Sequence, residues 1–466
     1  MAVMQTAVPV TDHPASGKVN QLYLLTISLT AALGGLLFGF DFSVISGGIH
    51  LIREYFQVGE LGEGFLGASL YIGCIAGAAI AGKLSDRYGR KRSLAVSAVL
   101  FAISCMGAAL SHNMYFFIVN RLIGGLGVGM ASILSPLYIA EVAPGKIRGR
   151  LVSINQLAIV IGIFITYFSN YLLLKRFGND SWRWMIGVGT IPSLLFFITS
   201  LIIPESPRWL LKRNKREAAY RIFSKIGDKV YADQQMKAID KVAHTGGKSS
   251  RRLLFRPEMK LVLTIGIVLA VFQQWCGINN IFIYAPKIFA AAGYGATSQL
   301  FQTIIIGLVN FLVTILAMAL VDRLGRKKLL LFGSLSLAVI YGVLGILFYA
   351  GAEQHGGLLP LILAAIAAYG ISLAPVTWVM ISEIFPNDIR GVGMSVSTMC
   401  LWFACFVLVQ TFPYILGHLQ GAGTFWLFAV ICAGGFLFIK IKVPETKGKS
   451  LEEIEELFRG KLSEGS

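Results

Sequence analysis

A single carboxylate, Asp41, lies inside a long apolar run that begins near Leu22. The surrounding segment, FGFDFSVISGG at 38–48, holds no other charged residue. A charge at the depth of a lipid bilayer costs at least ~2.5–3.5 kcal/mol on insertion scales, so such residues are rare and usually functional. Asp41 therefore requires a cationic partner, water or a proton of its own.

Arg121 is the partner that the sequence offers, because it is the other formal charge well inside an apolar run. The run that holds Asp41 ends near Gly48, and the run that holds Arg121 begins near Met114. At 1.5 Å rise per residue, both charges lie about seven residues, or roughly 10 Å, from the outer ends of their helices. Burial favours the protonated carboxyl, whereas a nearby guanidinium favours the carboxylate. A movement of Arg121 would let Asp41 take up or release a proton; a static structural ion pair is the alternative.

Six amide side chains and two tryptophans form a second group that could bind a ligand. They all fall within apolar runs: Gln156, Gln273, Gln274, Asn279, Asn280, Asn310, Trp378 and Trp402. Amides donate and accept hydrogen bonds, and an indole adds an apolar face, which together suit an uncharged polar ligand. Any one amide could instead join two helices, since a buried amide without a partner is costly. The whole set indicates a polar cavity at membrane depth.

These residues belong to a chain whose composition is that of a membrane protein. Of its 466 residues, 55% are hydrophobic and 14% are charged, whereas about one quarter is charged in soluble domains; this composition argues against a water-soluble enzyme. Apolar runs of about 20 residues, enough to span a bilayer, recur along the chain. We predict an all-α membrane protein with twelve transmembrane helices, at 22–48, 63–83, 92–110, 114–139, 150–174, 183–203, 259–288, 297–321, 328–350, 356–382, 391–417 and 422–443.

The net charge of +17 is explained by topology. When the predicted spans alternate, most of the 41 Lys and Arg residues fall on the side of the N-terminus. The exceptions on the opposite side are Arg53, Lys175, Arg176, Arg183 and Lys287. By the positive-inside rule we expect a multi-pass protein of the cell membrane with both termini cytoplasmic, and no nucleic-acid partner.

Three motifs occur twice and divide the chain into two halves. Asp86-Arg87-Tyr88-Gly89-Arg90-Lys91 returns as Asp322-Arg323-Leu324-Gly325-Arg326-Lys327, and Pro204-Glu205-Ser206 returns as Pro444-Glu445-Thr446. Glu141, Pro144, Arg148 and Gly149 return as Glu383, Pro386, Arg390 and Gly391. Such repeats are typical of transporters with two parallel six-helix halves and a site between them. We predict an N-tail at 1–21, six-helix halves at 22–203 and 259–443, an amphipathic helical linker at 204–258 and a C-tail at 444–466.

Charges at the cytoplasmic ends of the two halves mirror one another and predict a gate. Opposite charges could hold the halves together on this side and separate when it opens, although single surface ion pairs contribute only ~0–1 kcal/mol. Orientation signals alone would explain the basic residues but not the repeated acids. The predicted gate residues are Asp86, Arg87, Arg90, Glu141, Arg148, Arg150, Glu205, Arg208, Asp322, Arg323, Arg326, Glu383, Arg390 and Glu445.

The remaining motifs argue against enzymatic chemistry. The six cysteines fall in predicted spans without a CxxC pair, so we interpret them as packing residues and expect no metal site. The glycines of Gly124-Gly125-x-Gly127-x-Gly129 follow no strand and indicate close helix packing instead of a nucleotide-binding loop. We expect a protein that is not an enzyme and has no cofactor beyond a coupling proton.

Four motifs together resemble the sugar porter family of the major facilitator superfamily: the paired DRxGR loops, PESPRWL at 204–210, QQWCGIN at 273–279 and PETKG at 444–448. The resemblance covers nearly the whole chain, and is greatest to bacterial proton-coupled aldose symporters of the xylose type; facilitative glucose transporters are also similar. It implies that Asp41 and Arg121 carry proton coupling, and that the two tryptophans and the amides other than Asn280 contact the sugar. Ile163 and Leu401 depart from the pattern, since xylose symporters have glutamine at both positions. The expected site is therefore more apolar on two walls, which permits a hexose.

We therefore expect a monomeric, proton-coupled symporter of a monosaccharide, hexose or pentose, that works by alternating access in the lipid bilayer. Asp41 would carry the proton, Arg121 would tune it, and the amide cluster would hold the sugar. A facilitative sugar uniporter of the same fold is the main alternative; a polyol or inositol transporter and a membrane sugar sensor are others. The short final segment argues against the sensor, because sensors are expected to carry long signalling tails.

Overall fold

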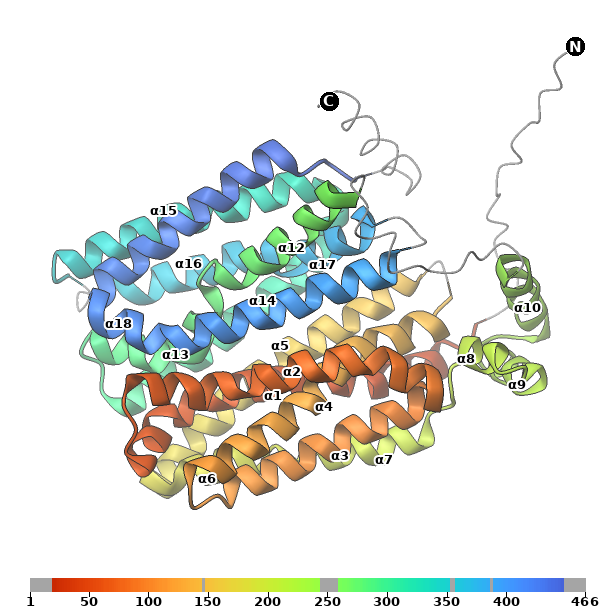
Figure 1. The fold of residues 1–466 in the computed structure, drawn as a ribbon, viewed down its shortest axis with the longest axis horizontal. Helices are drawn as coiled ribbons and strands as arrows, with labels where there is room; N and C mark the ends of the chain where they lie inside the picture. The colour runs from red at the N-terminus through yellow and green to blue at the C-terminus, as the bar shows by residue number, and fades with distance from the viewer. Residues whose placement is uncertain (1–18, 145–146, 244–258, 353–356, 386–388, 448–466) are drawn as a thin grey trace, which may run out of the picture.

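The chain folds into two helical bundles that lie side by side, one from each half of the sequence (Figure 1). The computed structural model describes residues 19–144, 147–243, 259–352, 357–385 and 389–447, and places their side chains except at 238–243, 321–323, 382 and 390–391. These residues are helical apart from short loops and one isolated β-bridge between Val19 and Gly227.

Long helices joined by short loops make up each bundle. The first contains α1 (Gln21–Phe56), α2 (Glu60–Tyr88), α3 (Arg90–Ala109), α4 (Met114–Val142), α5 (Arg148–Phe177), the 3-10 turn η2 (Gly178–Asp180), α6 (Ser181–Gly187) and α7 (Thr190–Ile202). The second contains α12 (Lys260–Trp275), α13 (Ile278–Ala291), α14 (Ala296–Leu324), α15 (Arg326–Tyr349), α16 (Leu358–Ile371), α17 (Leu373–Ile384) and α18 (Arg390–Lys442).

The described helices account for the twelve predicted spans. Ten helical stretches are long and apolar enough to cross a membrane, and two of these, Arg148–Ile202 and Val392–Lys442, contain 55 and 51 residues. Each of these two is long enough for two crossings, because one crossing needs about 20 residues. Within α18, the left-handed backbone of Gln420 (φ 53°) separates the two crossings. The all-α, twelve-span prediction is therefore confirmed in the part of the chain that the structure describes.

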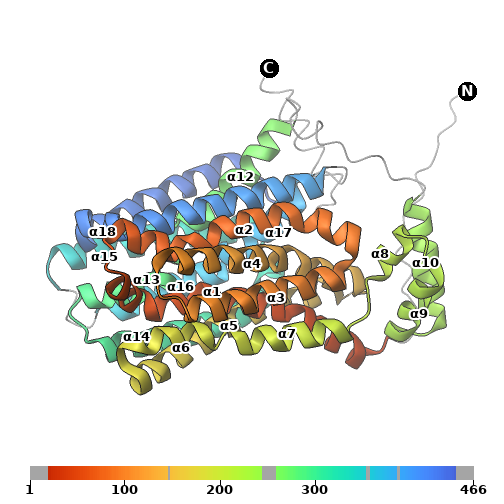
Figure 2. The ribbon, with the colours of Figure 1, turned by 60° about the horizontal axis from the view of Figure 1, so that its bottom comes forward.

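Three further helices, α8 (Pro207–Lys212), α9 (Arg216–Ile226) and α10 (Lys229–Ala243), stand beyond one end of the bundles (Figure 2). We call this the inner end and the opposite one the outer end. Helix α9 is amphipathic as predicted, since it buries Ala219, Phe223 and Ile226 among exposed basic residues. The backbone N–H of Asn20, just before α1, donates to the Ile226 carbonyl at 2.8 Å, so α9 is tied to the start of the first bundle.

Two predicted spans of the second half, 259–288 and 356–382, are each broken at membrane depth. The first breaks between α12 and α13, where Gly277 has a left-handed backbone (φ 85°). The second breaks between α16 and α17 at Ser372 (φ −119°, ψ −86°). A break frees backbone groups that have no water to bind in a bilayer, so it persists only where other groups satisfy them. Broken helices of this kind surround the substrate sites of many transporters.

Glycines bring α2 and α4 into backbone contact, as the glycine-rich segment of the sequence predicted. A Cβ atom added to Gly125 would overlap the carbonyl oxygen of Leu70, and one added to Gly129 would overlap the carbonyl oxygen of Cys74. Gly73 of α2 meets Leu122 of α4 in the same way. This packing fixes the depth of α2 relative to α4, which carries Arg121.

Replacement of Gly125 by alanine should destabilise the protein, because the new methyl group must push α2 and α4 apart. We expect a loss of ~1–3 kcal/mol, the usual cost of overpacking a well-packed core. Fluorescence-detected size-exclusion chromatography after heating would measure it. Gly342→Ala is the matched control, since no atom lies within 4 Å of a Cβ added there. Equal melting temperatures for the two variants would contradict the proposed packing constraint.

Candidate functional site

Asp41 and Arg121 form a buried ion pair, as their predicted equal depth suggested. Helices α1 and α4 are in direct contact, and Arg121 Nη1 donates a hydrogen bond of 2.5 Å to Asp41 Oδ1. Asp41 is 2% exposed and Arg121 is 1% exposed. Among the described residues, neither Asp41 Oδ2 nor Arg121 Nε has a hydrogen-bond partner. The carboxylate therefore keeps one oxygen on which a proton can bind.

Three amides of the QQWCGIN motif form a hydrogen-bonded chain at the break between α12 and α13. Gln274 Nε2 donates to Gln273 Oε1 at 3.4 Å, and Asn279 Nδ2 donates to Gln274 Oε1. All three side chains are buried. The left-handed Gly277 interrupts the helix between Gln274 and Asn279, whose side chains meet across the break.

Gln273 also satisfies the second helix break. Its Nε2 donates to the carbonyl oxygens of Leu373 and Ala374, at 3.3 and 3.2 Å, just after the interruption at Ser372. The two broken helices are therefore joined by this amide. Helix-to-helix bonding, the alternative that the sequence left open for each amide, applies to Gln273.

Other predicted site residues keep polar atoms without a protein partner. Among the described residues, Asn280 is fully buried with neither its Nδ2 nor its Oδ1 bonded, and the Trp402 Nε1 is buried and unbonded. Unsatisfied buried polar groups cost about 1–3 kcal/mol each, so they point to a bound ligand or solvent. Asn310 is 5% exposed, and Gln156 and Trp378 are partly exposed within their helices.

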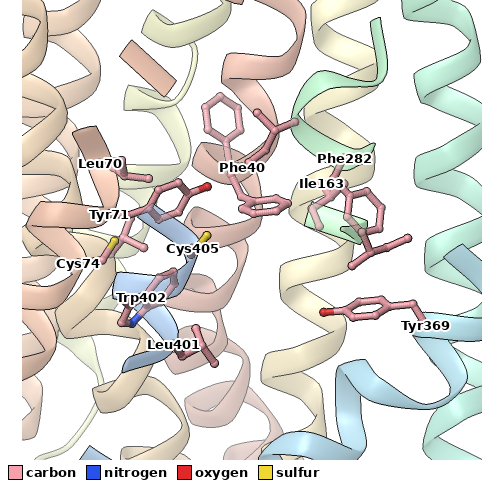
Figure 3. Packing of buried hydrophobic residues seen from close by; sticks show 14 of the residues in the cluster. Phe40, Leu70, Tyr71, Cys74, Ile163, Phe282, Tyr369, Leu401, Trp402 and Cys405 are labelled. Carbon is pink, nitrogen blue, oxygen red and sulfur yellow. The ribbon is translucent and has the colours of Figure 1, made fainter. Parts of the chain in front are cut away.

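The apolar positions that the sequence singled out lie near this polar set. Ile163 of α5 and Leu401 of α18 are 5% and 1% exposed. Figure 3 shows Leu401 and Trp402 on one helix turn, with Ile163, Phe282 and Tyr369 contributed by other helices. Side chains from both halves therefore converge on the same region of the membrane interior.

At the inner end, the repeated charges form the same network in each half. Arg90 donates to Glu141 and to Asp86, with N–O distances of 2.9 Å for both, and its backbone N–H donates to Glu205 at 2.8 Å. In the second half, Arg326 pairs with Glu383 at 3.1 Å, and its backbone N–H donates to Glu445 at 2.9 Å. Burial raises the pKa of the Glu445 carboxyl, but the four backbone N–H groups that donate to it have the opposite effect. The net result is a pKa below the usual range.

The described ion pairs do not include the predicted contacts of the gate, in which opposite charges join the two halves when the inner side is closed. Every inner-end ion pair among the described residues joins two residues of one half, because each arginine meets the acid of its own repeat. Arg87 lies over the Tyr88 ring, and Arg150 is exposed. The side chains of Asp322, Arg323 and Arg390 lie outside the described residues.

Two inner-end arginines lie close together. Burial and the neighbouring Arg208 guanidinium lower the pKa of Arg148. In the part of the chain that the structure describes, no carboxylate lies within ion-pair distance of Arg148 or Arg208. Both could therefore accept an acidic partner from the other half.

Three charges at the outer end form a contact between the halves that the sequence analysis missed. Glu63, at the start of α2 and 2% exposed, accepts hydrogen bonds of 2.9 Å from Arg53 Nη1 and from Lys287 Nζ. Arg53 belongs to the same half, because α1 continues to Phe56 instead of ending near 48, whereas Lys287 belongs to α13 of the other half. Arg53 and Lys287 were among the few cations on the non-cytoplasmic side, and that exceptional placement was the available signal.

Uncharged contacts also join the two halves, one of them deeper in the membrane and the other near the outer end. Tyr167 Oη of α5 donates to the Phe282 carbonyl of α13 at 2.6 Å. Gln410 Nε2 of α18 donates to the Leu61 carbonyl of α2 at 2.9 Å. The two halves are therefore bonded to each other at the outer end and, among the described charges, bonded internally at the inner end.

Lys287→Met should loosen the outer contact, because it removes the charge that reaches across the halves while Arg53 still neutralises Glu63. We expect a membrane-impermeant thiol reagent to label Phe282→Cys about 2- to 5-fold faster in this background, which matches an ion pair of ~0.5–1 kcal/mol. Lys175→Met is the control, since Lys175 contacts the Tyr171 ring of its own helix. Equal labelling in the two backgrounds would show that the Lys287–Glu63 pair does not hold the halves together.

Comparison with known proteins places this geometry in a family. Residues 27–458 match the family model described as "Sugar (and other) transporter". The chain is 41% identical to an arabinose-proton symporter of Bacillus subtilis over 98% of each chain, and 40% identical to a D-xylose-proton symporter of Escherichia coli over 95% of this chain and 97% of the relative. It superposes on the inward open conformation of the E. coli xylose transporter with a TM-score of 0.82 at 38% identity, covering 93% of this chain and 99% of that one. The chain belongs to the Sugar (and other) transporter family.

Proposed function

We propose that the chain is a proton-coupled monosaccharide symporter that works by alternating access across the cell membrane, with both termini cytoplasmic. The buried Asp41–Arg121 pair is the observation that carries this proposal, because it places a titratable group with one free oxygen at membrane depth. The relatives named as proton symporters of arabinose and xylose, at 41% and 40% identity, support the same assignment.

The proton acts by changing the strength of the ion pair. When Asp41 takes a proton on its free oxygen, it becomes neutral, and its Coulomb attraction to Arg121 in this medium of low dielectric is lost. The halves can then rearrange around the bound sugar. The proton comes from water on the outer side and returns to water on the inner side, so each cycle moves one proton with the sugar.

The sugar is held by the amides and tryptophans that converge from both halves. Gln274, Asn279 and Asn280 lie at the break of the seventh span, and Trp402 offers an N–H that the protein leaves unbonded. We assign Gln273 a supporting role, since its N–H groups already bond the other helix break. The proposed sugar contacts are Gln156, Gln274, Asn279, Asn280, Asn310, Trp378 and Trp402. The apolar Ile163 and Leu401 favour a sugar that presents carbon–hydrogen surface to these two walls.

Residues 22–203 and 259–443 are proposed as the two moving bodies, with 204–258 as the linker and 1–21 and 444–466 as tails. The networks around Arg90 and Arg326 keep the helix ends of each body together. Closure of the inner end would bring Arg148 and Arg208 to carboxylates of the second half. One chain contains both bodies and a complete site, so a monomer suffices.

Uptake by proteoliposomes tests this function, with labelled glucose, galactose, xylose, arabinose and inositol and an imposed inward proton gradient. We expect accumulation of one sugar above equilibrium, abolished by a protonophore. Asp41→Asn should lose the accumulation but keep sugar exchange between the two sides, because only coupling needs the titratable group. Arg121 remains in both proteins.

Equilibration that ignores the gradient would make the protein a facilitative uniporter and leave Asp41–Arg121 as a structural ion pair. Uptake of inositol alone would identify a polyol transporter. Loss of exchange in correctly folded Asp41→Asn would show that Asp41 is not chiefly a proton carrier.

Gln274→Ala should weaken sugar binding about 5-fold, since a lost neutral hydrogen bond costs ~1 kcal/mol. Binding of the transported sugar to the purified protein, measured by calorimetry, would show the change. Gln299→Ala is a matched control, because the Gln299 side chain bonds the Tyr294 carbonyl near the outer end. Unchanged affinity in Gln274→Ala would remove this amide from the sugar site.

A further inference from the structure

The Trp402 indole of the second half lies between two aromatic rings of the first half. It stacks on Tyr71 of α2, with ring centroids 6.0 Å apart and an interplanar angle of 20°. Phe38 of α1 meets it edge-on, at 5.4 Å and 79°. Figure 3 shows the Tyr71 ring alongside Trp402, with the Cys405 sulfur nearby. The orientation of this indole is therefore set largely by α1 and α2.

Both of these rings are mechanically linked to the Asp41–Arg121 pair. Phe38 precedes Asp41 by three residues on α1, which places the two side chains on neighbouring positions of one helix face. Tyr71 lies in the stretch of α2 that the glycines press against α4, next to Leu70, whose carbonyl meets Gly125. Arg121 is one turn before Gly125 on α4, and both Arg121 and Asp41 act electrostatically on the buried Tyr71 side chain.

We propose that Tyr71 is a positioning residue that couples the protonation of Asp41 to the orientation of the Trp402 indole, and through it to sugar binding. This inference rests on the proposed symport function. A neutral Asp41 releases Arg121, α4 and the α2 segment packed on it shift together, and the Tyr71 ring carries the shift to Trp402. The unbonded Trp402 Nε1 then meets a sugar hydroxyl in one protonation state and not in the other.

The effect belongs to Asp41 because the other groups around it are silent near neutral pH. The groups that act with Asp41 electrostatically are Arg121 of α4, Tyr71 and Cys74 of α2 and Cys105 of α3. Cys405 of α18 faces Tyr71. Thiols ordinarily titrate near ~8.5, phenols near ~10 and guanidinium groups above ~12. Among the groups around Asp41, its own carboxyl group is therefore the one that a pH series between about 5 and 7.5 can report on.

Sugar affinity as a function of pH, measured by calorimetry on the purified full-length protein, tests the proposal. The wild type should show a pH-dependent affinity together with proton-driven accumulation. Tyr71→Leu should bind sugar within about 3-fold of wild type at its best pH, but its affinity should change less than about 2-fold across the series, a difference of ~0.4 kcal/mol. Accumulation in proteoliposomes should fall several-fold while sugar exchange continues.

Tyr71→Phe should restore both the pH dependence and the accumulation, because the ring that stacks on Trp402 is retained. Tyr349→Leu is the matched control, since Tyr349 lies 5.7 Å from the Trp426 ring, on a helix outside the ion-pair region. Should Tyr71→Leu not yield folded protein, Tyr71→Met, whose unbranched side chain adapts to an irregular gap, serves in its place.

Wild-type coupling in folded Tyr71→Leu would overturn the proposal. It would also be overturned if Tyr71→Phe lost coupling as fully as Tyr71→Leu, or if exchange fell together with accumulation, because Tyr71 would then be structural. Failure of the symport function itself is recognised separately, by a wild type whose sugar affinity and accumulation ignore the proton gradient.

Discussion

The ion pair between Asp41 and Arg121 is the constraint on which the rest of the structure depends. Two charges at 2% and 1% exposure cannot be left apart in a medium of low dielectric, so α1 and α4 must stay in register at that depth. The glycine contacts of α4 with α2 fix the depth of this third helix relative to the ion pair. A protonation event at one carboxyl oxygen can therefore alter the fit of three helices, where a surface ion pair would alter almost nothing.

In the second half, uncharged amide side chains satisfy the backbone groups that the helix breaks leave free. Its broken helices expose backbone carbonyls at membrane depth, where an unsatisfied polar group is costly. Gln273 satisfies two of these carbonyls and is held by Gln274, which is held by Asn279. The amides that rigidify the breaks thus adjoin the amides with free polar atoms. A ligand that bonds Asn280 or Trp402 completes a network that the protein leaves incomplete.

The sequence could predict the ion pair because an apolar run fixes depth, and the rise per residue converts position into height. It could predict the amide cluster, but not the bond from Gln273 to Leu373, because Gly370 and Pro375 flank Ser372 without showing which side chain satisfies the break. The inner-end contacts between the halves stay a prediction for a related reason. A repeat shows which charges are equivalent, and equivalence by symmetry does not show that Arg90 and Glu141 pair within one half.

The two ends of the molecule differ in whether their ion pairs join the two halves, and this difference sets what each end loses when it opens. At the outer end Glu63 accepts from both halves, so opening there loses the bond to Lys287 while Arg53 prevents a bare buried carboxylate. At the inner end the described ion pairs stay intact when the halves separate, because each lies in a single half. A symporter needs two states of similar free energy. Opening the outer end loses only the bond from Lys287, while Arg53 still neutralises Glu63, so the free energies of the two states stay close. The protein therefore holds its outer end closed with a contact weak enough for a transport cycle to break.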